Sequence, residues 1–130
     1  MGRYAFFNTG FEYKFGFGVQ SSHDILEFAG TGNYGLIQNE EPRHEWILDD
    51  KRYIQRMMDA LEDHLGINGP FDFSIFESSP QGTSKLYSSL FDLMEKEKWD
   101  TNVFFHKYRL ACILYHQLLY TNILEAHYEL

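Results

Sequence analysis

The stretch Val103 to Leu124 reads VFFHKYRLACILYHQLLYTNIL and contains neither glycine nor proline, so no residue in it interrupts a helix. Apolar residues recur in steps of three and four, and others widen that stripe around the helix: Val103, Phe104, Tyr108, Leu110, Ala111, Ile113, Leu114, Tyr115, Leu118, Leu119 and Leu124. A helix that is apolar around so much of its circumference has to be buried. The stretch, with its flanks at Asp100 and Tyr128, therefore predicts one long C-terminal helix in the core.

A membrane anchor is the other structure that such a stretch could form. A helix that spans a bilayer needs about 20 predominantly apolar residues. The stretch instead carries five polar side chains inside its apolar part, which are His106, Lys107, Arg109, His116 and Gln117. We therefore expect a core helix and no membrane association.

The composition indicates a folded chain with little affinity for polyanions. The 130 residues suit a single domain spanning 1–130, and 18% aromatic residues are far from the composition of disordered chains. The net charge is −8, so the overall field repels phosphate backbones and anionic membrane surfaces. Nucleic-acid binding is therefore disfavoured.

The single cysteine and the N-terminus favour an intracellular protein. Cys112 has no partner for an internal disulfide and lies in the apolar stretch, where cysteine behaves as a small hydrophobic residue. The segment MGRYAFFNTGFEYKF has neither an apolar core nor a cleavage site of a secretory signal. We therefore expect a reducing compartment.

Upstream of this stretch, the sequence predicts an N-terminal hairpin followed by helices. Arg3–Phe7 and the alternating Phe11–Gln20 are strands around an Asn8–Gly10 turn. Gly16 and Gly18 indicate close approach of another backbone, or else a ligand groove. Helices are expected over Ser21–Phe28, from Asp49 to Leu65 and from Thr83 to Lys98, with short extended segments at Leu36–Ile37 and Phe71–Phe76. Asp49 and Asp100 are the expected N-caps of the second and last helices, and Gly66 is the expected C-cap of the second. The expected fold is α+β, with a hairpin or small antiparallel sheet packed against three to four helices.

One polar stripe on the last helix is the best candidate for a site. His106, Arg109, His116, Gln117 and Tyr120 fall within an arc of about 100° on a helix. The stripe has three interpretations, which are the solvated side of the helix, an internal polar network, or one wall of a cleft. The first is the default, because polar stripes on helices usually face water.

The cleft interpretation assigns roles to specific side chains. Its opposite wall would be the polar face of the hairpin, formed by Glu12, Lys14 and Gln20. Glu12, His106 or His116 would then serve as acid or base. Lys14, Gln20, Arg109 and Tyr120 would bind the ligand.

The spacing of the histidines excludes a metal site on the last helix. His106, His116 and His127 are ten and eleven residues apart, or about 15 Å along a helix axis, so no two can share a metal. No helical pair of histidines at i and i+4 exists elsewhere, and no nucleophile motif is present. We therefore expect neither a metal nor a cofactor.

Aromatic residues near the ends of the predicted elements suggest a contact surface. Tyr34, Trp46, Phe76 and Trp99 are of the types that anchor protein interfaces. The leading hypothesis is a non-enzymatic interaction or structural protein that binds a protein partner or itself. The alternative is a small enzyme or ligand-binding domain that uses the cleft described above.

Three stretches carry a resemblance to a group of viral proteins. They are YAFFNTGFEYKF at 4–15, HEW at 44–46 and YHQLLY at 115–120. These stretches resemble segments of small uncharacterised proteins encoded by giant nucleocytoplasmic DNA viruses of protists and algae. The resemblance implies a viral origin and a place in the host cytoplasm or the virion, and it brings no catalytic residues with it.

Overall fold

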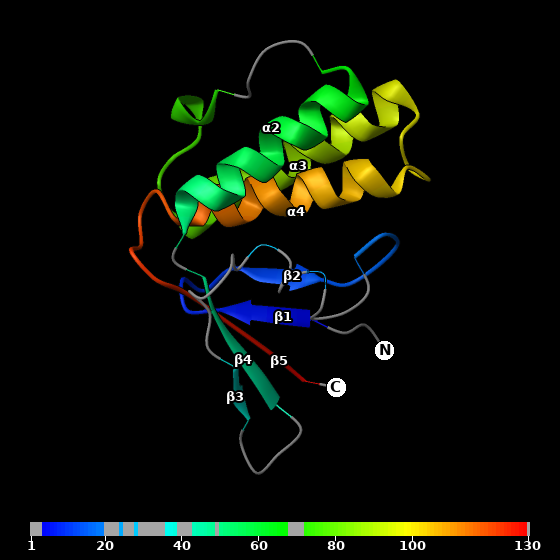
Figure 1. Cartoon of the computed structure of the whole chain (residues 1–130). Helices are drawn as coiled ribbons and strands as arrows, with labels where there is room; N and C mark the ends of the chain where they lie inside the picture. Colours follow the sequence, from blue (N-terminus) through cyan, green and yellow to red (C-terminus); the bar gives the residue numbers. More distant parts are fainter. Residues whose placement is uncertain are drawn as a thin grey trace.

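A computed structural model of the chain describes residues 4–19, 24, 28, 36–38, 43–48, 50–67 and 72–129. It confirms the expected α+β class, with a layer of helices lying over an antiparallel sheet (Figure 1). The elements are β1 (Tyr4–Phe7), β2 (Glu12–Lys14), β3 (Leu36–Gln38), β4 (Arg43–Leu48), α2 (Lys51–Leu65), η1 (Phe73–Ile75), α3 (Pro80–Glu97), α4 (Val103–Gln117) and β5 (Leu124–Glu129).

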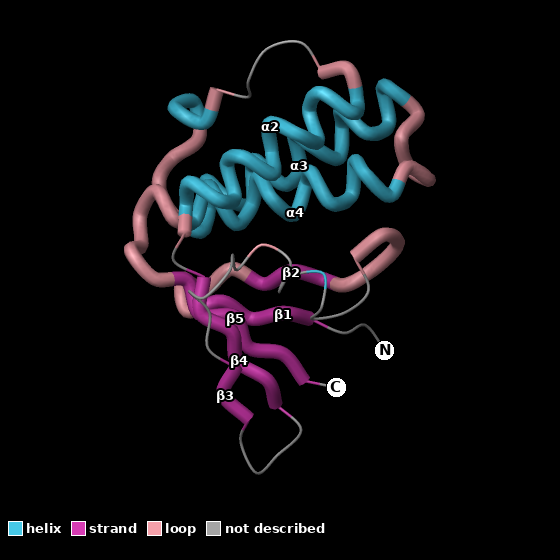
Figure 2. Tube along the Cα trace, viewed as in Figure 1, coloured by secondary structure: helices cyan, strands magenta, loops and turns pink. Residues whose placement is uncertain are grey.

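The sheet joins the two ends of the chain. Its strand order is β2-β1-β5-β4-β3, and all neighbouring strands are antiparallel. The hairpin β1–β2 forms around the predicted turn, with Gly10 at a φ of 97°, but its second strand is shorter than predicted. β2 ends at Lys14, and Gly16–Val19 form a turn instead of continuing the strand. The last strand, β5, lies between β1 and β4, so the N-terminal hairpin is joined to β3 and β4 only through the C-terminal strand (Figure 2).

The prediction of one helix from Val103 to Leu124 is wrong in its last part. Helix α4 ends at Gln117, and the chain turns before entering β5. The side chain of Asn8 holds this turn, since its amide donates to Ile123 O at 3.0 Å and its Oδ1 accepts from Glu125 N at 2.9 Å. Pairing with β1 and β4 outweighs the local helical pattern, because a strand between two neighbours satisfies its backbone on both sides.

The N-caps of α2 and α4 lie one and two residues after the predicted ones. Asp50, and not Asp49, caps α2 through a hydrogen bond of 3.0 Å from Tyr53 N. Gly66 ends α2 in the left-handed conformation, as predicted. Asn102, and not Asp100, caps α4.

Helix α3 starts three residues earlier than predicted, at Pro80. Ser79 is its N-cap, with Oγ accepting from Gly82 N at 3.1 Å, and proline is tolerated in the first turn because it lacks only an unused N–H. The segment expected to be extended at Phe71–Phe76 instead forms the short 3-10 helix η1 over its described part. β4 was not predicted as a strand, and most of the helix expected at Ser21–Phe28 lies outside the described residues.

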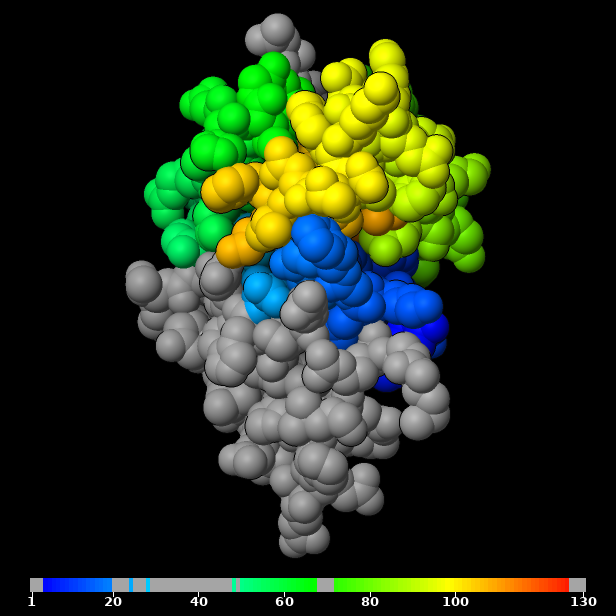
Figure 3. All heavy atoms as spheres, turned by 90° about the vertical axis from the view of Figure 1, so that its right-hand side faces the viewer, coloured from blue at the N-terminus to red at the C-terminus, as the bar shows by residue number. Residues whose placement is uncertain are grey.

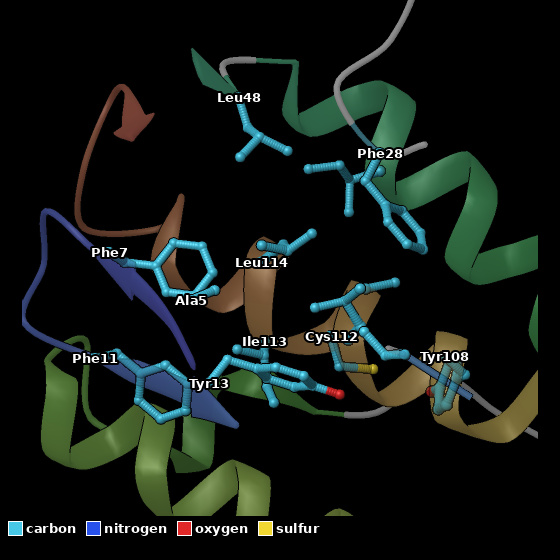
Figure 4. Packing of buried hydrophobic residues seen from close by; sticks show 14 of the residues in the cluster. Ala5, Phe7, Phe11, Tyr13, Phe28, Leu48, Tyr108, Cys112, Ile113 and Leu114 are labelled. Carbon is cyan, nitrogen blue, oxygen red and sulfur yellow. The ribbon is translucent and has the colours of Figure 1, made fainter. Parts of the chain in front are cut away.

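The core lies between α4 and the inner face of the sheet. Ala5, Phe7 and Tyr13 of the hairpin point toward Ile113 and Leu114 of α4 (Figure 4). Phe28 and Leu48 close the core on the side of α2. Within the described residues, no helix combines the length and apolar character needed to cross a membrane.

Candidate functional site

Three of the five residues of the predicted polar stripe are buried, whereas His106 and Tyr120 are half-buried. Arg109 is 7% exposed, and both His116 and Gln117 are fully buried. The stripe faces α3 and the turn between β1 and β2, where it meets other polar groups. For the three buried residues, the interpretation as a solvated helix face is therefore wrong, and they form internal polar contacts instead.

His116 is at the centre of this network. Its Nδ1 lies 2.7 Å from Oγ1 of Thr83, which in turn lies 2.8 Å from the hydroxyl of Tyr120. The Thr83 hydroxyl also lies 3.2 Å from Ser79 O, so this one group joins α3 to α4. Thr83 is fully buried, which leaves no route for a substrate to this hydroxyl.

Burial lowers the pKa of His116, whereas the backbone of Phe76 and Glu77 acts in the opposite direction. The rings of Phe73 and Phe76 lie 6.4 Å from the imidazole. Nε2 is buried and forms no hydrogen bond with the described residues. His116 is thus a neutral, enclosed histidine that holds the segment around η1 against α3 and α4.

The network continues to the hairpin turn through Gln117. Thr9 Oγ1 donates a short hydrogen bond to Gln117 Oε1, and Gln117 Nε2 donates to Ile113 O at 3.4 Å. Burial raises the pKa of Tyr120, while hydrogen bonds with Thr83 and Thr9 partly lower it. Sequence reasoning missed both threonines, because neither position carries a spacing signal that links it to α4.

Arg109 is held by aromatic rings. Its guanidinium carbon lies 3.5 Å from the ring centroid of Tyr87 and 5.4 Å from that of Phe91. Nη2 donates to Tyr87 O at 3.0 Å, whereas Nε is buried without a partner among the described residues. Burial lowers the pKa of Arg109, and the partial charges of Tyr87 and Tyr13 oppose that shift. The cation–π contact accounts for its position between α3 and the hairpin.

His106 lies apart from Arg109 and His116, near the start of α4. Its Nε2 lies 2.8 Å from Asp100 O, and its ring lies 5.2 Å from that of Phe17. Gly18 adopts a φ of 80°, and a Cβ at this position would lie 2.7 Å from His106 Cβ. The predicted close approach is therefore found at Gly18, where α4 lies against the glycine, but not at Gly16, where an added Cβ would meet nothing within 4 Å.

The hairpin residues of the predicted cleft do not meet the stripe. Glu12 and Lys14 are exposed and alternate with the buried Tyr13, whose ring faces α3 at 5.7 Å from Tyr87. Gln20 lies outside the described residues. Glu12, His106 and His116 are consequently in three different environments, and the described residues do not assemble the cleft.

The aromatic residues singled out from the sequence are also placed differently from expectation. Trp99 is half-buried with its ring 5.2 Å from that of Phe105, and Phe76 is half-buried beside His116. The side chain of Trp46 and all of Tyr34 lie outside what the structure describes. The exposed rings are instead those of Phe6, Phe17, Phe91 and Phe104.

No known family, curated protein or solved structure matches the chain. The site must therefore be interpreted from its own geometry.

A shallow groove of about 360 Å³ lies beside the hairpin. Its lining comes from the β1–β2 turn with the first residue of β2 on one side and the first turns of α3 on the other, through Gly10, Phe11, Glu12, Pro80, Gln81 and Ser84. Among the described residues, no group of three His, Cys, Asp or Glu side chains could hold a metal ion. Cys112 is fully buried, and burial raises the pKa of its thiol far above the ordinary value.

Proposed function

We propose that the protein is a non-enzymatic interaction protein that binds a protein partner, or a second copy of itself, through exposed apolar side chains. The support comes from one end of the helical layer, around the first turn of α4. Phe17, Val103 and Phe104 are 50%, 42% and 45% exposed there. We call these three residues the apolar end surface.

Two histidine rings pack against the aromatic rings of the apolar end surface. The ring of His106 lies 5.2 Å from that of Phe17, and the ring of His64 lies 4.0 Å from that of Phe104. In Figure 3 the blue segment of the Gly16–Val19 turn lies directly against the gold start of α4. Aromatic rings held by neighbours lose little side-chain entropy on binding, as is usual for interface anchors.

Among the described residues, no contact requires these side chains to be exposed. Val103 and Phe104 occupy the first turn of a helix whose following residues are mostly buried. Single exposed apolar residues are common, but here exposed apolar side chains of two distant segments lie around the same helical turn, since Phe17 packs on His106 and Val103 and Phe104 begin α4. This clustering is the observation that carries the proposal.

We also propose that this interaction takes place in the cytoplasm of a virus-infected host cell or within a virion. The support for this is the resemblance of the three quoted stretches to proteins of giant DNA viruses. The net charge of −8 repels the phosphates of nucleic acids, so the partner we propose is a protein.

A photo-crosslinking residue at position 104 tests the contact surface in the cells that produce the protein. We expect an adduct with one protein species, or with a second copy of the chain. The matched control carries the same residue at Ile75, which is 72% exposed but lies on η1. Equal adduct patterns from the two positions would refute the proposal.

A further inference from the structure

The free edge of β2 is a second place where the fold can accept another chain. β2 is the terminal strand of the sheet. Phe7 N donates to Phe11 O at 3.1 Å, so Phe11, and with it Tyr13, directs its backbone groups toward β1. In an antiparallel strand, every second residue directs its N–H and C=O toward one neighbour, and the residues between them direct these groups toward the other edge. Glu12 and Lys14 therefore direct N–H and C=O away from β1, and no described residue bonds to them.

Space for another strand exists beside this edge. The groove of about 360 Å³ has the β1–β2 turn and Glu12 at the start of the edge as one wall, and the first turns of α3 as the other. A paired strand would lie about 4.8 Å from β2. The side chains on the helix wall are Pro80, Gln81 and Ser84, which are small or flexible. A groove between an edge strand and a helix is a known geometry for binding an extended peptide.

We propose that the groove between β2 and α3 binds an extended segment of a partner protein, which adds to the sheet as a strand antiparallel to β2. The backbone of Glu12 and Lys14 supplies the hydrogen bonds. This groove is separate from the apolar end surface, so the proposed peptide binding and the proposed function can be refuted independently of each other.

The charges on β2 define the chemistry of the segment. Glu12 and Lys14 are both exposed and lie on the same face of the strand. Opposite charges directly across a strand pair attract, and like charges repel. An antiparallel segment therefore presents, from its N- to its C-terminus, an acidic residue opposite Lys14, one intervening residue, and a basic residue opposite Glu12.

The same two charges explain why the edge does not pair indiscriminately. Charged side chains on edge strands discourage aggregation with apolar strands. The edge is also short, because beyond Lys14 the N–H of Gly16 already donates to Val19 O at 2.9 Å. The groove therefore selects a short segment with the complementary order of charges.

Three synthetic peptides test the proposal on the full-length, ¹⁵N-labelled protein by NMR titration. The first is acetyl-Thr-Val-Glu-Val-Lys-Val-Thr-amide, the second exchanges its Glu and Lys, and the third carries N-methyl groups on the amides that face β2. We expect the first to shift the amide signals of Glu12, Lys14 and Ser84 and to bind about fivefold more tightly than the second. The third should not bind.

A charge-exchanged protein supplies the matched control. The double variant Glu12→Lys, Lys14→Glu keeps the net charge and should reverse the preference between the first two peptides. The proposal is overturned if the preference stays the same, if the N-methylated peptide binds equally well, or if no peptide shifts the β2 signals. Concentration-dependent shifts of Glu12 and Lys14 without peptide would also overturn it, because they would assign the edge to a second copy. Phe104→Ser should leave peptide binding unchanged, whatever its effect on the apolar end surface.

Discussion

Replacing Gly82 with alanine should destabilise the protein, although the same change in most helices stabilises it. Gly82 lies in the first turn of α3 and is buried against the backbone of Glu77. An added Cβ would overlap the carbonyl oxygen of Glu77 and lie 2.6 Å from its carbon, where ordinary contacts begin at 3.4 Å. The obstructing atoms are backbone, so the segment before α3 has to move.

The magnitude follows from what that movement disturbs. Overpacking of this kind costs about 1–3 kcal/mol. Movement of Glu77 also strains the Ser79 cap, whose Oγ accepts from Gly82 N at 3.1 Å, and loss of a cap costs about 0.5–2 kcal/mol. Alanine returns about 1 kcal/mol through its higher helix propensity. We expect a net loss of about 2 kcal/mol.

Urea unfolding followed by circular dichroism measures this change, with the midpoint compared at a constant m-value. Ser88→Ala is the matched control, because Ser88 is exposed in the middle of the same helix and should gain a few tenths of a kcal/mol at most. A Gly82→Ala protein as stable as the original would refute the account, since it would mean that Glu77 can withdraw without cost.

Three further predictions concern the buried polar groups. Thr83→Val removes the hydrogen-bond partner of both His116 and Tyr120, so it should lower the free energy of unfolding in urea by about 1–3 kcal/mol. Tyr120→Phe leaves Thr83 bonded to His116 and should therefore cost less. Because burial lowers the pKa of His116 below the ordinary 6.5, the unfolded chain binds the proton first, and stability should fall as the pH drops below about 6.5. His116→Gln should flatten that dependence in urea titrations between pH 7.5 and pH 5, and an unchanged slope would contradict it. Cys112 should react with a thiol reagent only at the rate of unfolding, and rapid labelling of the native protein would show that the thiol is accessible.

Local patterns predicted most helices and the hairpin, because the signals involved are short-range. The Gly66 end of α2 and the Gly10 turn depend on glycine at positive φ, which is visible in the sequence. The strand β5 could not be predicted in this way. Its pairing partners, β1 and β4, are far away in the chain, and its apolar residues also fit a helical pattern.

The orientation of the α4 stripe also depends on distant residues. The rule that polar residues face water assumes that a helix has a wet side. α4 packs against α2, α3 and the hairpin, so His116 and Gln117 can be paired only by groups from those elements. Thr83 is 33 residues from His116, and Thr9 is 108 residues from Gln117. Sequence periodicity cannot predict such pairs, because it relates only residues within one helix or strand.

Helix α4 buries polar side chains in its last turn and exposes apolar side chains in its first turn, which is the reverse of the usual distribution. Its last turn buries His116 and Gln117, and that arrangement has a structural explanation, since the hydrogen bonds with Thr83 and Thr9 compensate for the loss of water. Its first turn leaves Val103 and Phe104 exposed, although the Gly16–Val19 turn and His64 of α2 lie against other sides of this turn. Hydrogen bonds explain the polar end apart from His116 Nε2, which has no partner among the described residues, whereas no such contact explains the exposed apolar end. The apolar end is therefore where a function outside the fold is to be sought.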